Sequence, residues 1–344
     1  MNDISNSEYI INSAQHIASI DENTVAIVSS KEQYILRGVG ISIAVADILN
    51  EFTTCSTILA VVDALSNKFT EDSIRRLIYM FIDKGVLLKS PDNDSFDETA
   101  LEKFTFFVSK AKTFDDLVEK ASTLKIGIVG TSTLVNGLLE YFLNSSLVKH
   151  FFVGTLNADN RLYPVSNDVI ITEYNLFSDL NKVQEIVVNS DFVIAASSQF
   201  DHHFFNCVNS YCYAAKKEWI RVALSGFIAE IGPLFIPGET CCYSCLRAGM
   251  LRNLTDNEII LDKLMATDNF HKKMKGNILG FSTLYPLNSI ASGIACAESL
   301  KYTMGTGSSI VSEVLSMNCA DYTICRSVVL RDYTCSVCSD VALP

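Results

Sequence analysis

Two pairs of cysteines with metal-ligand spacing lie near the end of the chain, Cys242 with Cys245 and Cys335 with Cys338. A Cys-x-x-Cys loop points both thiolates to one side, so each pair can supply two corners of a tetrahedral zinc site. Four cysteine ligands leave no open coordination position, which predicts a structural ion. The alternative is two redox pairs or chance spacing, but neither pair lies in a thioredoxin-like context.

Composition indicates a globular protein with a large core, because the chain has 344 residues and 49% hydrophobic content. That length is enough for two domains. The other seven cysteines lie in apolar stretches, where a free cysteine usually behaves as a small core residue. They are Cys55, Cys207, Cys212, Cys241, Cys296, Cys319 and Cys325.

Location and charge limit the classes of partner. The first residues lack a basic segment followed by an apolar one, so no signal peptide is expected. No apolar run approaches ~18 residues, the length of a membrane span. We therefore expect a cytoplasmic protein, in which thiols and metal sites are favoured over disulfides. The net charge of −12 argues against a nucleic-acid surface, whereas a basic partner or simple solubility would each explain it.

The first part of the chain, residues 1–92, has the pattern of a small α+β winged-helix domain. Residues 24–38 predict a hairpin or a three-stranded sheet. Three segments with helical periodicity follow, and a short strand closes the domain. Arg75 and Arg76 are nearly the only clustered basic residues here, so DNA binding is not expected.

The rest of the chain predicts a linker and an α/β domain. An acidic stretch rich in turn-forming residues predicts a linker over residues 93–122. The second domain, residues 123–344, opens with the buried-strand pattern Leu124–Gly130 and an amphipathic helix. Further strands alternate with helices, which predicts a Rossmann-like, doubly wound parallel sheet.

The loop after that first strand is where a nucleotide would bind, because a glycine-rich turn lets backbone N–H groups approach phosphates. Gly130 keeps the first glycine of a G-x-G-x-x-G pattern, but Ser132 and Val135 replace the other two. A side chain at the second position crowds a pyrophosphate. Asp159 comes late for an acidic residue that holds a ribose, and a turn is the simpler explanation for it.

The segments Gly232–Cys245 and Tyr333–Cys338 resemble the ubiquitin-activating-like family that includes the ThiF and MoeB enzymes. The resemblance covers roughly residues 120–340. The preceding winged-helix pattern is similar to the peptide-recognition element of members that act in ribosomal peptide natural-product biosynthesis. Two branches combine these parts: microcin C-type enzymes that adenylate a peptide, and partner proteins that deliver a precursor peptide to a YcaO cyclodehydratase.

The departures from the family pattern favour the second branch. Adenylating members need an intact glycine loop, an Asn-x-x-Arg segment and a late aspartate associated with magnesium. Here Asn157–Arg161 is a shortened form of that segment, and Ser197–Gln199 stands where the aspartate is expected. Asp201, two residues later, is a possible substitute. Because phosphoryl chemistry depends on positioned cations and metal, losing several such groups should cost much more than one substitution.

Other catalytic interpretations have little support, and we assign no catalytic residue. His202 and His203 beside Asp201 suggest a metal or general-base site, but neighbouring side chains on a helix or strand point in different directions. Ser225 and Ser292 lack a nucleophile-elbow pattern.

The resemblance implies a leader-peptide-binding scaffold subunit of an ATP-dependent cyclodehydratase complex. A precursor leader would add as a strand to the N-terminal sheet and dock against the third helix. The expected contacts are Gln33, Tyr34, Ile35, Leu36, Arg75, Ile78 and Tyr79. Azolines would form from Cys, Ser or Thr of the precursor on a YcaO-type partner, towards a bacteriocin-type product.

Several further expectations follow from the same resemblance. A flavin dehydrogenase is a further candidate partner, and a homodimer is a further candidate assembly. The alternative function is a microcin C-type peptide adenylyltransferase that uses ATP and Mg, with Arg161 and Asp201 in unusual positions. A DNA-binding regulator would need a basic helix face that the sequence lacks.

Overall fold

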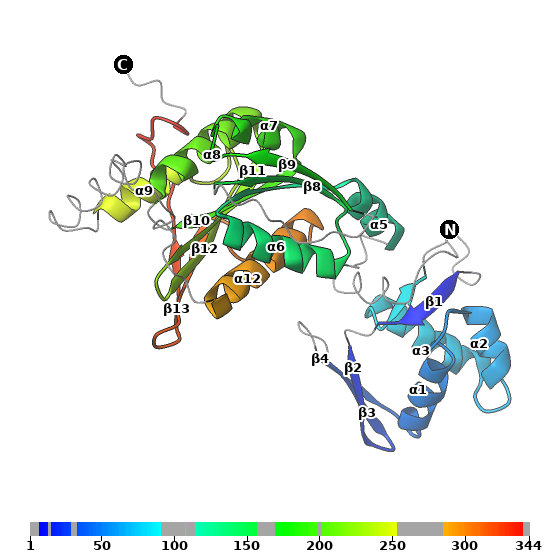
Figure 1. Cartoon of the computed structure of the whole chain (residues 1–344). Coiled ribbons are helices and arrows are strands. Elements are labelled where there is room, and N and C mark those ends of the chain that lie inside the picture. Colours follow the sequence, from blue (N-terminus) through cyan, green and yellow to red (C-terminus); the bar gives the residue numbers. More distant parts are fainter. Residues whose placement is uncertain are drawn as a thin grey trace. The chain divides into compact units, whose positions relative to one another are not determined.

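The chain divides into two compact units, residues 1–120 and 121–344. The computed structural model (Figure 1) describes residues 7–12, 15–28, 33–90, 107, 114–156, 169–198, 201–252 and 285–339. Most of the predicted linker, residues 93–122, lies outside the described residues.

The N-terminal unit is a small α+β fold with two antiparallel sheets. One sheet has the strand order β5-β1-β6 and the other the order β2-β3-β4. Its elements are β1 (Glu8–Ile11), β2 (His16–Asp21), β3 (Thr24–Val28), β4 (Gln33–Arg37), α1 (Ile41–Asn50), β5 (Ser56–Thr57), α2 (Ile58–Leu65), α3 (Glu71–Asp83) and β6 (Leu87–Lys89). The segment predicted as a hairpin or a small sheet thus belongs to a three-stranded sheet.

Helix α3 illustrates why this unit folds. Ile74, Ile78 and Phe81 are fully buried, and their spacing places them on one face of a helix. Glu71 and Asp72 occupy the first turn, where acidic side chains interact favourably with the helix dipole. The chain then turns at Gly85, whose φ of 67° favours glycine. This apolar face packs against residues of α1, α2 and β3 in one core.

The C-terminal unit is an α/β fold built on an eight-stranded sheet. Helix α5 (Phe114–Thr123) spans the division between the two units. The elements that follow are β7 (Lys125–Gly130), α6 (Ser132–Ser145), β8 (His150–Thr155), β9 (Ile170–Asn175), α7 (Lys182–Asn189), β10 (Phe192–Ser198), α8 (His202–Ala215), β11 (Glu218–Ser225), β12 (Ile228–Phe235), α9 (Tyr243–Arg252), α12 (Tyr285–Thr303), β13 (Glu313–Asn318) and β14 (Thr323–Val328).

The predicted Rossmann-like sheet is confirmed, with an antiparallel extension that the sequence analysis did not predict. Strands β9-β8-β7-β10-β11 are parallel and follow the order of a doubly wound fold. Strands β12, β13 and β14 continue the sheet antiparallel. Helices α6 and α12 cover one face, and α7 and α8 cover the other (Figure 1). None of the described helices has the length and hydropathy that crossing a membrane requires.

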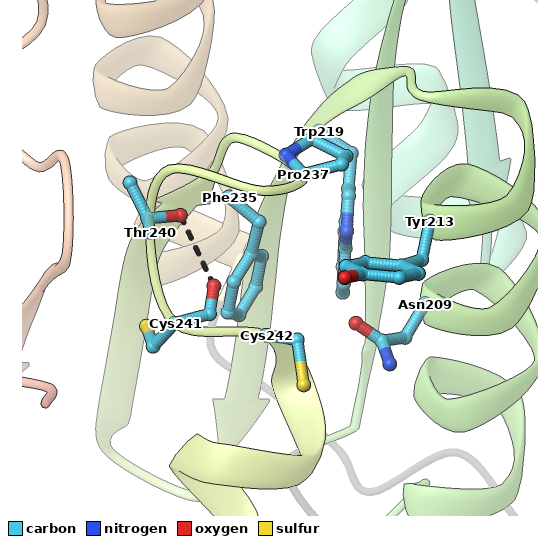
Figure 2. Close-up of a pocket in the computed structure, with 8 residues that line it drawn as sticks. All are labelled: Asn209, Tyr213, Trp219, Phe235, Pro237, Thr240, Cys241 and Cys242. Atoms are coloured by element: carbon cyan, nitrogen blue, oxygen red, sulfur yellow. Dashed lines mark hydrogen bonds between the residues drawn. The ribbon is translucent and has the colours of Figure 1, made fainter. Parts of the chain in front are cut away.

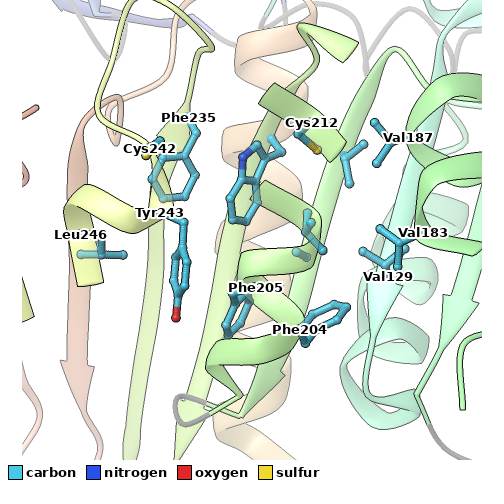
Figure 3. Close-up of a cluster of buried hydrophobic side chains, with 14 of the residues drawn as sticks. Val129, Val183, Val187, Phe204, Phe205, Cys212, Phe235, Cys242, Tyr243 and Leu246 are labelled. Carbon is cyan, nitrogen blue, oxygen red and sulfur yellow. The ribbon is translucent and has the colours of Figure 1, made fainter. Parts of the chain in front are cut away.

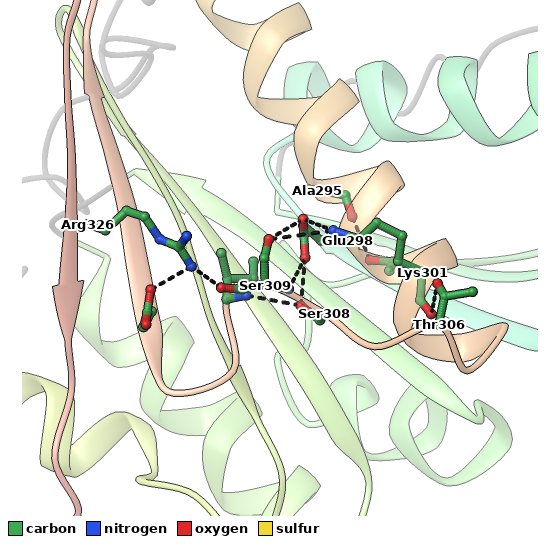
Figure 4. Close-up of polar contacts among 10 residues, drawn as sticks. Ala295, Glu298, Lys301, Thr306, Ser308, Ser309 and Arg326 are labelled. Carbon is green, nitrogen blue, oxygen red and sulfur yellow. Dashed lines mark hydrogen bonds and ion pairs between the residues drawn. The ribbon is translucent and has the colours of Figure 1, made fainter. Parts of the chain in front are cut away.

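The turn between α12 and β13 is held by a buried carboxylate, Glu298, which is 7% exposed (Figure 4). Its oxygens accept hydrogen bonds from Lys301 Nζ at 2.6 Å, from the Ser308 hydroxyl at 2.7 Å, and from the Ser309 N–H and hydroxyl at 2.8 and 2.7 Å. Burial raises the pKa of Glu298, but these hydrogen bonds outweigh it, so the net pKa is lowered. A buried carboxylate is stable here because its oxygens are satisfied.

Replacing Glu298 with glutamine is expected to lower the free energy of unfolding by about 1–3 kcal/mol at pH 7, because charge-assisted hydrogen bonds are lost. A lowered folded-state pKa stabilises the fold above the unfolded pKa, and this contribution is lost as pH falls through the folded pKa. The difference from the unmodified chain should therefore shrink below about pH 4. Urea unfolding at pH 7, 5 and 3.5 measures it, with exposed Glu239→Gln as the control. A difference that does not change with pH would contradict the argument.

Candidate metal centre and nucleotide crevice

Four buried cysteine sulfurs from two distant segments meet in the C-terminal unit. The Sγ atoms of Cys242, Cys245, Cys335 and Cys338 all lie within 4.8 Å of one another. The Cys242–Cys245, Cys242–Cys335 and Cys245–Cys338 distances are 3.9, 3.5 and 3.4 Å. None is a disulfide, since all four are free thiols. The structure thus brings together the four residues predicted from their spacing.

The geometry of the cluster fits one tetrahedral ion. Metal–sulfur bonds of about 2.3 Å place the sulfurs of a tetrahedral zinc site roughly 3.8 Å apart. The three sulfur separations of 3.9, 3.5 and 3.4 Å lie close to that value, and no pair is farther apart than 4.8 Å. Burial raises the pKa of the Cys242 thiol to about 12, so a buried thiolate needs a cation beside it. These four cysteines could therefore hold a metal ion, with no position left open for catalysis.

The first pair is positioned by the core around the start of α9. Tyr243 packs against α8, where Phe205 lies 5.4 Å from Tyr243 between ring centres, and Leu246 belongs to the same buried cluster (Figure 3). The Tyr243 N–H donates to Asn209 Oδ1 at 2.9 Å. Buried aromatic residues and a satisfied helix start thus fix the backbone on which Cys242 and Cys245 stand.

The second pair is tied to the first by Arg331 and Asp332. The Asp332 N–H donates to Cys245 Sγ at 3.3 Å, and its carboxylate accepts from Thr334 N and Oγ1 at 2.9 and 2.7 Å. Arg331 donates to the carbonyls of Gly238, at 3.1 Å, and of Cys338. One guanidinium thus joins the loops that carry the two pairs, as outer-shell residues of metal sites commonly do.

A small pocket beside this centre is lined by Asn209, Tyr213 and Cys242 among others (Figure 2). Its volume of about 10 Å³ is close to the smallest space that holds a single water molecule. Trp219 and Phe235 close it with rings stacked 4.4 Å apart. The pocket is therefore too small for a substrate.

The crevice where a Rossmann-like fold binds nucleotides lies between the carboxyl ends of β7 and β10. A Cβ atom on Gly130 would lie 1.6 Å from the Ala196 carbonyl oxygen, so the packing of β10 against β7 itself requires this glycine. Val135, at the position of the third glycine, is buried. Retention of Gly130 is therefore explained without a nucleotide. The segment Asn157–Arg161, with Asp159, lies outside the described residues.

Asp201 lies at the same crevice but serves as the N-cap of α8. Its Oδ1 accepts from the Phe204 N–H at 3.4 Å, and its Oδ2 accepts from the Ser197 hydroxyl at 2.8 Å. Both carboxylate oxygens are thus engaged in local structure. The neighbouring His202 is buried, and its Nδ1 lies 2.8 Å from the Tyr243 hydroxyl. Burial, with smaller effects from Arg247 and Arg221, lowers the His202 pKa to about 4, so the imidazole is neutral at pH 7.

The structure also contains a buried ion pair that sequence reasoning missed. Arg221 on β11 is 0% exposed, and its Nη2 lies 2.8 Å from Glu230 Oε2 on β12. The two atoms are not aligned for a linear hydrogen bond. Arg221 also lies over the Phe205 ring, 5.1 Å from its centre. In the sequence, this ion pair is indicated only by a charged residue, Arg221, within the apolar pattern of a strand.

The residues predicted to bind a peptide lie on β4 and α3. Gln33 and Ile35 are exposed on β4, and Ile35 is 49% exposed, whereas Tyr34 and Leu36 are half-buried. Tyr79 on α3 is 42% exposed. Ile78 is fully buried, which corrects its assignment as a contact: it belongs to the core face of α3. Arg75 pairs with Glu71 at 2.8 Å.

The C-terminal unit is a Rossmann-like α/β domain, and its four-cysteine cluster follows the last parallel strand, β11. Residues 155–337 match the ThiF family, and the chain belongs to that family. The matched region begins after the loop Gly130–Gly137, where the chain departs from the nucleotide-binding pattern.

Matches to individual proteins cover more of this chain than the ThiF family region does. HesA of Leptolyngbya boryana is 22% identical over 254 residues, which cover 72% of this chain and 82% of HesA. The crystal structure of E. coli MccB with AMPCPP and MccA has a TM-score of 0.71 and 17% identity, covering 97% of this chain and all of MccB. The heterocyclase TruD has a TM-score of 0.66 and 15% identity, covering 97% of this chain and 43% of TruD. At these identities, the two structures establish a shared fold.

Proposed function

We propose that this chain is a peptide-binding subunit in the biosynthesis of a ribosomally made, modified peptide, and that it delivers a precursor leader to a YcaO-type cyclodehydratase. The observation that carries the proposal is the extent of the structural likeness: 97% of the chain, including the N-terminal unit, is covered by both MccB and TruD. MccB was crystallised with MccA, and TruD is a heterocyclase. The metal held by the four cysteines would be zinc, which four thiolates suit.

Strand β4 is where the leader would add. Within the described sheet β2-β3-β4, it pairs only with β3. An edge strand presents unpaired backbone donors and acceptors to which an extended peptide can pair. Half-buried Tyr34 and Leu36 pack against the core, and Lys84 Nζ at the end of α3 lies 4.9 Å from the centre of the Tyr34 ring. The exposed Tyr79 on α3 would then contact the leader beside the strand.

The test uses binding of a fluorescently labelled precursor peptide encoded beside the gene for this chain, measured by anisotropy. Ile35→Glu is expected to weaken binding at least tenfold, because it places a charge on the edge strand. Ile20→Glu is the matched control, since Ile20 is an isoleucine 61% exposed on β2, at the other edge of the same sheet. Its effect should stay below twofold. Equal losses for the two variants, or no binding by the unmodified chain, would contradict leader recruitment at β4.

The second candidate is a peptide adenylyltransferase that uses ATP and Mg. It is favoured by the start of α6, where the Thr131 side chain makes no capping hydrogen bond, so phosphate could approach the helix N-terminus. Ser132, Val135 and the engaged Asp201 count against it. Calorimetry with Mg-ATP separates the candidates: micromolar binding would favour adenylation, and no binding at millimolar ATP would favour the scaffold.

A further inference from the structure

A cavity of about 200 Å³ lies between α6 and α12, the helices that cover the sheet face opposite α7 and α8 (Figure 1). Its walls include Glu140 and Asn136 from α6 and Tyr285, Asn288 and Ser289 from α12. None of the four clustered cysteines lines it. The volume is below the roughly 300–1,000 Å³ of sites for drug-sized ligands, so it suits a group the size of one side chain.

The two helices approach closely beside the cavity. A Cβ atom on Gly137 would lie 2.8 Å from Ser292 Oγ, so a glycine is needed for the helices to pack at this distance. Asn288 is buried, and its Nδ2 donates to the Thr133 carbonyl at 3.0 Å. The amide oxygen of Asn288 accepts no hydrogen bond from the described residues. A buried acceptor without a donor is costly, and a ligand that supplies an N–H would relieve that cost.

The charge of the cavity is negative and uncompensated within the described part of the chain. Glu140 is half-buried on its wall and forms no ion pair with any described residue. Tyr285, 67% exposed, supplies an aromatic ring from the facing helix. A carboxylate, an amide oxygen and an aromatic ring together favour a cation with several N–H donors. Guanidinium meets this description better than ammonium, because its planar fork pairs with a carboxylate and also stacks on aromatic faces.

We propose that the cavity between α6 and α12 binds a guanidinium group, carried either by a small molecule or by an arginine side chain of a polypeptide. The Glu140 carboxylate accepts hydrogen bonds from the guanidinium, the Tyr285 ring stacks on it, and the Asn288 amide oxygen accepts a further N–H. None of the residues that line the cavity belongs to the metal centre or to β4, so the proposal does not depend on the proposed delivery of a leader peptide.

The test is calorimetry of the full chain with N-acetyl-arginine amide and with N-acetyl-citrulline amide, which has a neutral group of the same shape. The blocked arginine is expected to bind at least tenfold more tightly. Glu140→Gln should remove that preference. Glu185→Gln is the control, because Glu185 is an exposed glutamate on α7, on the other face of the sheet, and it should keep the preference. Agmatine and a blocked Gly-Arg-Gly peptide then distinguish the two sources, since the better ligand identifies the natural carrier.

Tyr285→Leu provides an independent variant if Glu140→Gln alters folding, because the Tyr285 side chain is largely exposed and its loss should still weaken arginine binding severalfold. Three outcomes would overturn the proposal. They are equal binding of the arginine and citrulline compounds, no binding of either at millimolar concentration, and the same loss in Glu185→Gln as in Glu140→Gln.

Discussion

Replacing Cys242 with serine is expected to release the metal ion and to lower the free energy of unfolding by about 3–5 kcal/mol, because loss of a metal site is among the few single-residue changes with so large an effect. Cys242 Sγ lies 3.5 Å from Cys335 Sγ, and the two residues are 93 positions apart in the chain. An ion held by the four cysteines would therefore close a long loop and would also neutralise buried thiolates. For a unit of this size the melting temperature should fall by roughly 10 °C.

Metal analysis of the purified chain and thermal unfolding measure this prediction together. Cys207→Ser is the control, since Cys207 is half-buried on α8 and lies outside the cluster. Burial raises the pKa of Cys207 to about 11, so it remains a neutral thiol and its loss should leave the metal content unchanged. If Cys242→Ser retains both its metal and its melting temperature, the four cysteines do not hold a structural ion.

Glu230→Leu is expected to have the second large effect, a loss of about 3–5 kcal/mol in the free energy of unfolding, because it leaves the Arg221 charge buried without a partner. The Arg221 side chain is fully buried, whereas that of Glu230 is 12% exposed. A buried cation cannot recover its hydration when the carboxylate is removed. The double variant Arg221→Met with Glu230→Leu should regain most of the loss, because two apolar side chains then replace the pair.

Urea unfolding of the two single variants and the double variant gives the coupling between the residues. Glu313→Leu is the matched control, because Glu313 pairs with Arg326 at 2.6 Å while that arginine side chain is 52% exposed. Breaking an exposed pair should cost less than about 1 kcal/mol. Additive effects of the Arg221 and Glu230 substitutions, or equal losses for Glu230→Leu and Glu313→Leu, would show that burial of the charge does not determine the cost.

Local sequence patterns were sufficient to predict an element where the residues that form the pattern lie close together in the chain. The helical period over residues 71–83 correctly predicted a helix, but Ile78 was assigned as a peptide contact and instead lies on the buried face of α3 with Ile74 and Phe81. The helical period groups apolar side chains on one face, and it does not show whether that face packs against the core or binds a peptide. Contacts of the leader with β4 and α3 stay predictions.

The fold class and the four cysteines could be predicted from the sequence, because buried strands, helical periods and Cys-x-x-Cys loops are short-range patterns with direct physical causes. Contacts between residues far apart in the chain became evident from the folded structure. The fold continues the sheet beyond β11 with antiparallel strands β12, β13 and β14, in that order. It also pairs Arg221 with Glu230, and it engages Asp201 with Ser197 and the start of α8. It also formed the cavity between α6 and α12. These features depend on which residues meet when separate elements pack, and no local pattern specifies that choice.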